Sequence, residues 1–381
     1  MAADLKFVDR SFRIGCGRYI QEAGALSFAG REALRLVTGI AGLPEGMLCP
    51  PGKEKIAVIC GRTALSEASP ALDDSLRGAG FEPVYYIYEG FCNPGHGDRM
   101  IAKGLFDGAS LVVGAGGGNV MDISKYCSIK ARLPLMNIPT TSATCAACTP
   151  LSVLYDDECG YLRSQHWPVE VGCVIADTDV LARQPLRMMT SGVFDAAAKL
   201  PEISHRLRGR TEDETDAGLF ASSVLGEYTW RRLFELLPSA AAELSERRCG
   251  RALYDLIFLT VCLTGAISGL ARGSNQSALA HKIYETSRTL RPGTVRDYLH
   301  GELVAIGMIV QIAYNDGGDC SRAGEFRKLL AGYSMPLSLK ELGLPASDAG
   351  AFYEAIASSS AMAGTSDSEK KLLRDCLGLI F

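Results

Sequence analysis

Two groups of residues in this 381-residue chain have the types and spacing that chemistry requires. The first is the glycine-rich run at residues 111–125 (LVVGAGGGNVMDISK), which lies between an apolar segment and a helical pattern. Glycine lets the backbone approach a ligand closely, and the free N–H groups that begin a helix favour phosphate. The run therefore predicts a pyrophosphate cradle, although a tight structural turn fits the same residues. Because Asn119 takes the place of the last glycine, the usual dinucleotide fingerprint is broken.

The second group is one aspartate and two of the five histidines. Asp195 lies among small apolar residues, where a carboxylate costs free energy unless it is paired or bound to a metal. His281 and His300 lie in or beside helical patterns, whereas His205 stands among arginines and is expected to be exposed. One Asp and two His with an open fourth position is the pattern of a catalytic divalent metal, which polarises an alcohol or carbonyl oxygen. Spacing alone also allows each histidine to be an ordinary residue at a helix end.

The elements around these residues differ between the two halves of the chain. Helical patterns separate five short apolar runs, which predicts βαβ units and a parallel sheet; these runs are residues 55–60, 82–88, 110–113, 135–138 and 171–176. Long helical patterns then dominate and predict an all-α domain; they are residues 215–237, 240–248, 252–270, 300–315 and 350–362. We therefore expect an α/β domain over residues 1–177 and a helical domain over residues 178–381.

Composition and charge exclude several classes of protein. The net charge is −4 and no block of like charge stands out, so no nucleic-acid partner is expected. The N-terminus has no basic region followed by an apolar region, so no signal peptide is expected. The apolar stretch 256–271 is expected to be a buried helix that is too short to span a membrane. Thirteen dispersed cysteines predict reduced thiols and a cytoplasmic location. The spacing of Cys145 and Cys148 lacks the partners of a zinc ribbon or a redox motif, and we interpret it as coincidental.

Taken in order, these residues resemble the glycerol dehydrogenase branch of the iron-containing alcohol dehydrogenase superfamily, from about Arg13 to Val310. The segments that carry the resemblance are residues 15–26 (GCGRYIQEAGAL), 116–125 (GGGNVMDISK), 139–155 (PTTSATCAACTPLSVLY), 192–196 (GVFDA), His281 and residues 300–302 (HGE). The resemblance implies an N-terminal Rossmann-like α/β domain with a parallel sheet and an all-α C-terminal domain. This is the dehydroquinate synthase-like or iron-dependent alcohol dehydrogenase fold, with the active site in the cleft between the domains.

The resemblance also implies an activity and a set of site residues. The activity is NAD(P)-linked interconversion of a small alcohol or polyol and its ketone or aldehyde. One divalent metal, Zn²⁺ in preference to Fe²⁺, is expected on Asp195, His281 and His300. The implied NAD or NADP site consists of Gly117, Gly118, Asn119 and Asp122 near the pyrophosphate, with Thr140, Thr149, Leu151 and Tyr155 on the nicotinamide side. A homo-oligomer with a small-molecule substrate, and no membrane partner, is expected.

Four departures from the family pattern bear on the substrate and the cofactor. Cys145 stands where the family has a substrate-contacting Asp, and a thiol is a weak partner for hydroxyl groups. We therefore expect a substrate that is less polar than glycerol or carries a different charge. Asn119 replaces a lysine beside the phosphates, and Lys199 stands where some relatives have a fourth metal-binding His. Arg62 follows the first predicted strand, where the family often has an acid for the ribose, and so favours the 2′-phosphate of NADP.

Two alternative functions stay open at this level. A lyase on the same fold, resembling dehydroquinate synthase, would use NAD transiently and would need several Lys and Arg residues around a phosphate. The loop around Cys145 carries none of these residues. A cofactor-binding protein without turnover is the other alternative, and retention of all three metal positions argues against it.

Overall fold

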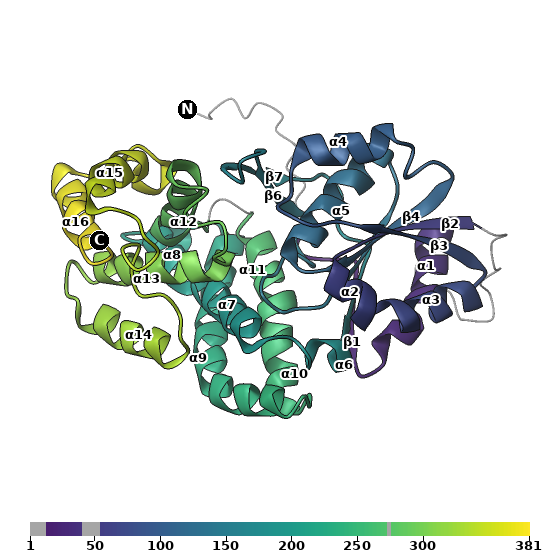
Figure 1. The fold of residues 1–381 in the computed structure, drawn as a ribbon. Helices are drawn as coiled ribbons and strands as arrows, with labels where there is room; N and C mark the ends of the chain where they lie inside the picture. Colours follow the sequence, from purple (N-terminus) through teal and green to yellow (C-terminus); the bar gives the residue numbers. More distant parts are fainter. Residues whose placement is uncertain (1–12, 40–53, 273–275) are drawn as a thin grey trace.

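The computed structural model describes residues 13–39, 54–272 and 276–381, and it consists of two lobes side by side (Figure 1). The residues on which the expectation about a leader sequence rests, 1–12, lie outside these ranges. The strands are β1 (Arg18–Glu22), β2 (Glu54–Cys60), β3 (Phe81–Ile87), β4 (Ala109–Gly116), β5 (Leu135–Pro139), β6 (Leu151–Tyr155), β7 (Tyr161–His166) and β8 (Cys173–Asp177). The helices of the first lobe are α1 (Ala29–Thr38), α2 (Arg62–Glu67), α3 (Ser69–Gly78), α4 (Pro94–Ala102) and α5 (Gly118–Ala131).

The second lobe is helical. Its helices are α6 (Thr178–Leu181), α7 (Leu186–Ala197), α8 (Lys199–Leu207), α9 (Ala217–Ser245), α10 (Arg251–Ile257), α11 (Thr264–Leu270), α12 (Leu279–Leu290), α13 (His300–Asn315), α14 (Ser321–Gly332), α15 (Ala349–Ala357) and α16 (Asp367–Leu377). In the described part of the chain, every element after β8 is helical. The boundary between Asp177 and Thr178 itself stays a prediction.

The first lobe is built on a six-stranded parallel sheet with the order β1-β8-β5-β4-β2-β3. Helices α4 and α5 cover one face and α1, α2 and α3 the other (Figure 1), with a separate apolar cluster on each side. Because both faces are buried, the inner strands are almost continuously apolar, as in the buried run Ile56–Cys60 of β2. The predicted parallel sheet is confirmed, and the short polar strand β1 is an addition that no apolar run indicated.

The order of the strands reverses between β2 and β4, because β3 extends the sheet on one side and β5 on the other. Ligands of open parallel sheets bind at such a switch point, outside the carboxyl ends of the strands. Cys60 of β2 pairs with Ala115 of β4, so Gly61 and the glycine turn after Gly116 leave the sheet side by side at that point.

Helix α9 corrects one expectation about the second lobe. The sequence pattern predicts two helices separated near Pro238, but α9 runs unbroken from Ala217 to Ser245. Proline removes one backbone hydrogen bond and crowds the preceding turn. Here the residues on both sides of Pro238, among them Leu233, Leu237 and Ala240, are buried along one face, and this packing keeps the two halves in line.

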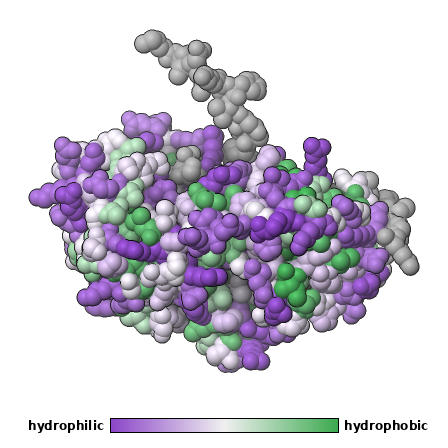
Figure 2. Space-filling model, turned by 45° about the horizontal axis from the view of Figure 1, so that its top comes forward, coloured by the Kyte–Doolittle hydropathy of each residue, from purple (hydrophilic) through white to green (hydrophobic). Residues whose placement is uncertain are grey.

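The apolar stretch after residue 250 is longer than expected. A π-helical segment, Phe258–Leu263, joins α10 to α11 into a continuous helical run, Arg251–Leu270. Among the described residues, this run alone is long and apolar enough to cross a membrane by length and composition, and 56% of its apolar 18-residue window is buried within the fold. On the face in Figure 2, hydrophilic side chains cover most of the surface and hydrophobic ones form small separate patches.

Candidate active site

One cavity of about 1340 Å³ is lined by residues of both lobes. All of the residues predicted from the sequence for the substrate, cofactor and metal contribute to its walls. They are Arg62, Gly117, Gly118, Asn119, Asp122, Thr140, Cys145, Thr149, Leu151, Tyr155, Asp195, His281 and His300. The folded chain thus gathers into one cavity residues that are separated by more than two hundred positions.

The glycine turn begins helix α5 at the end of β4. Gly117 is the N-cap of α5, and no side chain caps the helix. The N–H groups that begin the helix therefore have no side-chain acceptor, and Gly117 and Gly118 line the cavity. A Cβ on Gly118 would lie 3.0 Å from Oγ1 of Thr144, so a larger residue would push away the loop that follows β5. The turn therefore has the backbone groups and the close approach that a pyrophosphate needs.

Asp122 and Lys125 form a buried pair behind this turn. The Lys125 Nζ atom lies 2.8 Å from Asp122 Oδ1 and also donates to the carbonyl oxygens of Ala146, Thr149 and Leu151. Asp122 Oδ2 accepts a hydrogen bond of 3.0 Å from the backbone N–H of Val153. Burial raises the pKa of Asp122, and Lys125 opposes that shift. The pair fixes α5 to the loop and strand that line the nicotinamide side.

Arg62 begins α2 at the outer rim of the cavity. Its Nε and Nη2 atoms donate to the two carboxylate oxygens of Glu89 at 3.0 and 3.1 Å, and both side chains are exposed. The hydrogen bonds from Arg62 lower the pKa of Glu89. A phosphate on Arg62 would therefore have to share or replace an existing carboxylate partner.

Asp195, His281 and His300 converge from three helices. Asp195 lies within α7, His281 lies near the start of α12, and His300 is the first residue of α13. The Nε2 atoms of His281 and His300 lie 3.5 and 3.3 Å from Asp195 Oδ1, and one ligand atom from each residue lies within 4.8 Å of the others. Spacing left this convergence open, and the fold brings the three side chains together.

The donor set fits a divalent cation. Asp195 Oδ1 is buried and has no well-formed hydrogen bond to any described residue, although two imidazoles face it. Burial would raise the pKa of Asp195, but His300 and His281 hold it well below its usual range. One carboxylate and two imidazole nitrogens suit Zn²⁺ or Fe²⁺.

Glu202 orients His281, and the sequence patterns gave no indication of this role. Its Oε2 atom lies 2.5 Å from His281 Nδ1, and Oε1 accepts hydrogen bonds from the backbone N–H groups of Ala278 and His281. Nδ1 is thereby committed to the carboxylate and Nε2 is turned toward Asp195. Burial lowers the pKa of His281, but Glu202 and Asp195 outweigh it and raise that pKa to about 9.

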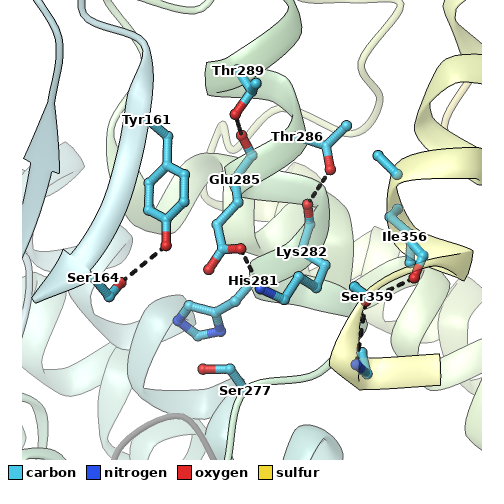
Figure 3. A network of polar contacts seen from close by, with 12 residues as sticks. Tyr161, Ser164, Ser277, His281, Lys282, Glu285, Thr286, Thr289, Ile356 and Ser359 are labelled. Atoms are coloured by element: carbon cyan, nitrogen blue, oxygen red, sulfur yellow. Dashed lines mark hydrogen bonds and ion pairs between the residues drawn. The ribbon is translucent and has the colours of Figure 1, made fainter. Parts of the chain in front are cut away.

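The ring of His281 lies below the side chains of Tyr161 from β7 and Glu285 from α12, which extend in the same direction side by side (Figure 3). Lys282 donates to the carboxylate of Glu285 from the same helix. Tyr284, one turn from His281, packs against the ring of His300 at 4.2 Å between centroids, and its hydroxyl contacts the hydroxyl of Tyr155. Helix α12 thus contacts Tyr155, one of the residues that the resemblance places on the nicotinamide side.

Comparisons with known proteins agree with this architecture. Residues 46–170 match the model of the family "Iron-containing alcohol dehydrogenase". A glycerol dehydrogenase of Pseudomonas putida is 28% identical over 86% of this chain and 84% of its own length. Hydroxycarboxylate dehydrogenase A of Escherichia coli is 26% identical over 74% of this chain and 76% of its own length. The crystal structure of glycerol dehydrogenase from Schizosaccharomyces pombe superposes with a TM-score of 0.79 at 21% identity, covering 98% of this chain and 90% of that one.

The family match, the glycerol dehydrogenase relatives and the structural neighbours together support the glycerol dehydrogenase-like branch of the iron-containing alcohol dehydrogenase superfamily. The predicted resemblance and fold class are therefore confirmed. The superfamily consists of NAD(P)-dependent alcohol oxidoreductases that use a divalent metal, and the cluster of Asp195, His281 and His300 is consistent with that chemistry.

Two positions that depart from the superfamily pattern lie close to the metal candidates. Cys145 lines the cavity, and burial raises the pKa of its thiol to about 11. Lys199, one helical turn after Asp195, also lines the cavity and is only 4% exposed. Cys148 turns away from Cys145, and its Sγ atom lies 3.9 Å from Sγ of Cys16. All cysteines in the described ranges are free thiols.

The expectation that His205 is exposed is wrong. Its side chain is buried between α13 and the segment after α15, with Nε2 2.9 Å from the carbonyl oxygen of Ala361. Burial lowers the pKa of His205. The neighbouring arginines misled the interpretation because they are themselves packed against the fold: Arg206 donates to the carbonyl oxygens of Ser277 and Ser360, and Arg208 lies over the ring of Tyr314, which His205 also contacts.

Proposed function

We propose that this protein is a metal-dependent, NAD(P)-linked oxidoreductase that interconverts a small alcohol or polyol and its ketone or aldehyde. The observation that carries the proposal is that Asp195, His281 and His300 converge on the same cavity that the glycine turn at the switch point of the sheet lines. The names of the relatives, glycerol dehydrogenase and hydroxycarboxylate dehydrogenase among them, agree with oxidation at a carbon that bears a hydroxyl group.

Asp195, His281 and His300 would hold one divalent cation, and Zn²⁺ suits the set best because its ligands are one carboxylate and two imidazoles. When bound, such a cation supplies Lewis-acid polarisation of an alcohol or carbonyl oxygen. Glu202 keeps Nε2 of His281 directed at the site. The hydroxyl proton of the substrate would pass to water.

The N–H groups of the first turn of α5 would bind the pyrophosphate of NAD or NADP, with Gly117, Gly118 and Asn119 closest to it. Thr140, Thr149, Leu151 and Tyr155 line the same cavity and would position the nicotinamide, which carries the hydride. Asp122 forms an ion pair with Lys125, so it would support this arrangement through that pair and not as an unpaired charge.

The choice between NAD and NADP depends on Arg62. We infer from its position after β2 that it would meet the adenosine ribose, as the sequence suggests. Its pairing with Glu89 makes a 2′-phosphate compete with a carboxylate, so the preference for NADP is expected to be modest. Self-association and a cytoplasmic location also stay predictions.

The test is a crossed screen of small alcohols, aldehydes and ketones against NAD(H) and NADP(H), with metal content measured on the same preparation. The variant Asp195→Ala is expected to lose the bound metal and to lower kcat/KM at least about 100-fold, because a ligand and its charge are removed. Asp73→Ala, which removes an acid paired with Arg77 on α3, is the matched control and should leave both unchanged. Full activity of Asp195→Ala with unchanged metal content would refute the site.

A further inference from the structure

Lys199 is a buried cation in the wall of the active-site cavity. It follows Asp195 by four residues, and the helical backbone continues through Ala198 (φ −59°, ψ −22°), so the two side chains lie on the same side of the helix. Its positive charge lowers the pKa values of Cys145, Asp195, Glu202 and His281. Only 4% of the residue is exposed, and it lines the cavity.

No partner in the described part of the chain satisfies this ammonium group. No carboxylate lies within 4.0 Å of Nζ and no hydrogen bond joins Lys199 to another described side chain. Lys125, which is equally buried, shows how this fold treats a lysine that has only a structural role: Asp122 and three backbone carbonyls surround its Nζ. A buried charge without a partner costs free energy, so a ligand that supplies one gains binding energy.

The acids near Lys199 are already engaged. Asp195 faces the two histidines, and Glu202 accepts three hydrogen bonds from the segment that begins α12. Glu285 pairs with Lys282 on its own helix (Figure 3). The thiol of Cys145, which lines the same cavity, supplies no negative charge, because burial raises its pKa to about 11.

The charge balance points in the same direction. The charges of Asp195, Glu202 and Lys199 sum to −1. A divalent cation on the candidate metal ligands would turn this into an excess of one positive charge in a buried site. A monoanionic substrate would neutralise that excess, whereas a neutral polyol would leave it.

We propose that Lys199 binds the carboxylate of the substrate, so that the alcohol is a small 2-hydroxy acid and the carbonyl compound is the corresponding 2-oxo acid. This rests on the proposed function and names its substrate class. One helical turn separates Asp195 from Lys199 on the same wall of the cavity, which suits a small molecule that carries its reacting oxygen and its anionic group close together. Oxidation removes a hydride from the carbinol carbon to C4 of the nicotinamide and releases the hydroxyl proton to water, which gives the 2-oxo acid, NAD(P)H and H⁺.

The experiment compares two carbonyl substrates of similar size, pyruvate and hydroxyacetone, in which a carboxylate is exchanged for a CH₂OH group. The holoenzyme is expected to reduce pyruvate with a kcat/KM at least about ten-fold higher than that for hydroxyacetone, because one charge-assisted hydrogen bond contributes a factor of about this size. Lys199→Met should lower kcat/KM for pyruvate by at least about ten-fold and change that for hydroxyacetone by less than about three-fold. Lys199→Arg should recover part of the loss for pyruvate, because it keeps the charge.

A binding measurement without turnover gives an independent readout. Oxamate, an unreactive analogue of a 2-oxo acid, is titrated calorimetrically into the metal-loaded protein with NADH or NADPH present. Binding is expected for the wild type and for the control Lys328→Met, which removes an exposed lysine paired with Glu325. Lys199→Met should bind oxamate at least about ten-fold more weakly at unchanged metal content.

The outcomes separate this inference from the proposed function. No reduction of any carbonyl compound with either cofactor would reject the proposed function and this inference together. Reduction of hydroxyacetone in preference to pyruvate, or an equal loss for both substrates in Lys199→Met, would reject only the role of Lys199. Unchanged oxamate affinity in Lys199→Met would reject it as well.

Discussion

At the scale of single residues, the candidate metal site depends on a glutamate that no motif contains. Glu202 is completely buried and holds both the imidazole of His281 and the backbone that begins α12. Its distance in sequence from His281, 79 positions, hides the relation from any local pattern. The signal that could have found it is a glutamate within a run of apolar residues on α8, since a buried carboxylate requires partners.

The first prediction concerns this glutamate. Glu202→Gln is expected to weaken metal binding by about 10- to 100-fold, because an amide holds His281 less firmly and reduces the basicity of its ring. Metal titration of the metal-free protein measures the effect. Glu325→Gln on the surface of α14 is the control, and an unchanged metal affinity in Glu202→Gln would show that His281 does not need this partner.

At the scale of elements, close contact between helices α7 and α13 brings Asp195 and His300 together. A Cβ on Gly301 would lie 1.9 Å from the carbonyl oxygen of Ser191, so the two helices touch backbone to backbone at that point. The pair Arg187 and Glu302 joins the beginnings of the same helices, with contacts of 2.6 and 2.7 Å. The sequence H-G-E at the start of α13 therefore places a ligand candidate, a contact point and an ion pair in consecutive positions.

The second prediction tests this contact. Gly301→Ala is expected to destabilise the protein by about 1–3 kcal/mol through overpacking and to weaken metal binding, because α13 must move away from α7. Gly324→Ala in α14 meets no atom within 4 Å and should be neutral or stabilise by up to about 1 kcal/mol. Chemical denaturation and metal titration of both variants measure the difference. Equal stability of the two variants would show that α13 adapts without cost.

At the scale of the whole molecule, the cavity joins a nucleotide-binding sheet to a bundle of helices. The switch point of the sheet and the three ligand candidates on α7, α12 and α13 face the same space. A cation that binds all three helices binds only the folded state, so its binding free energy adds to the stability of the helical lobe.

The third prediction follows from this linkage. Removing the metal with a chelator should lower the melting temperature, and returning Zn²⁺ or Fe²⁺ at about 100 times its Kd should restore about 2.7 kcal/mol of stability. Thermal unfolding with and without added metal gives the measurement. The Asp195→Ala variant should show no shift, and a shift of full size in that variant would place the cation elsewhere.

Local patterns were sufficient for the parallel sheet, the helical second half and the glycine turn, because alternation of short apolar runs and helical periodicity is imposed over neighbouring residues. They failed for β1, whose polar residues gain their place by pairing with β8, and for the break expected at Pro238, which packing on both sides overrides. The site residues came from motifs, and their roles stay predictions.

The order of residue types along the chain thus determines its family resemblance, the glycine turn and the candidate ligands, since these are properties of short segments. Folding alone decides that Asp195, His281 and His300 meet, that Glu202 stands behind them and that Lys199 has no partner among residues 13–39, 54–272 and 276–381. The physical reason is that distances between side chains on different helices depend on how whole helices pack, and backbone contacts such as that of Gly301 with Ser191 set those distances.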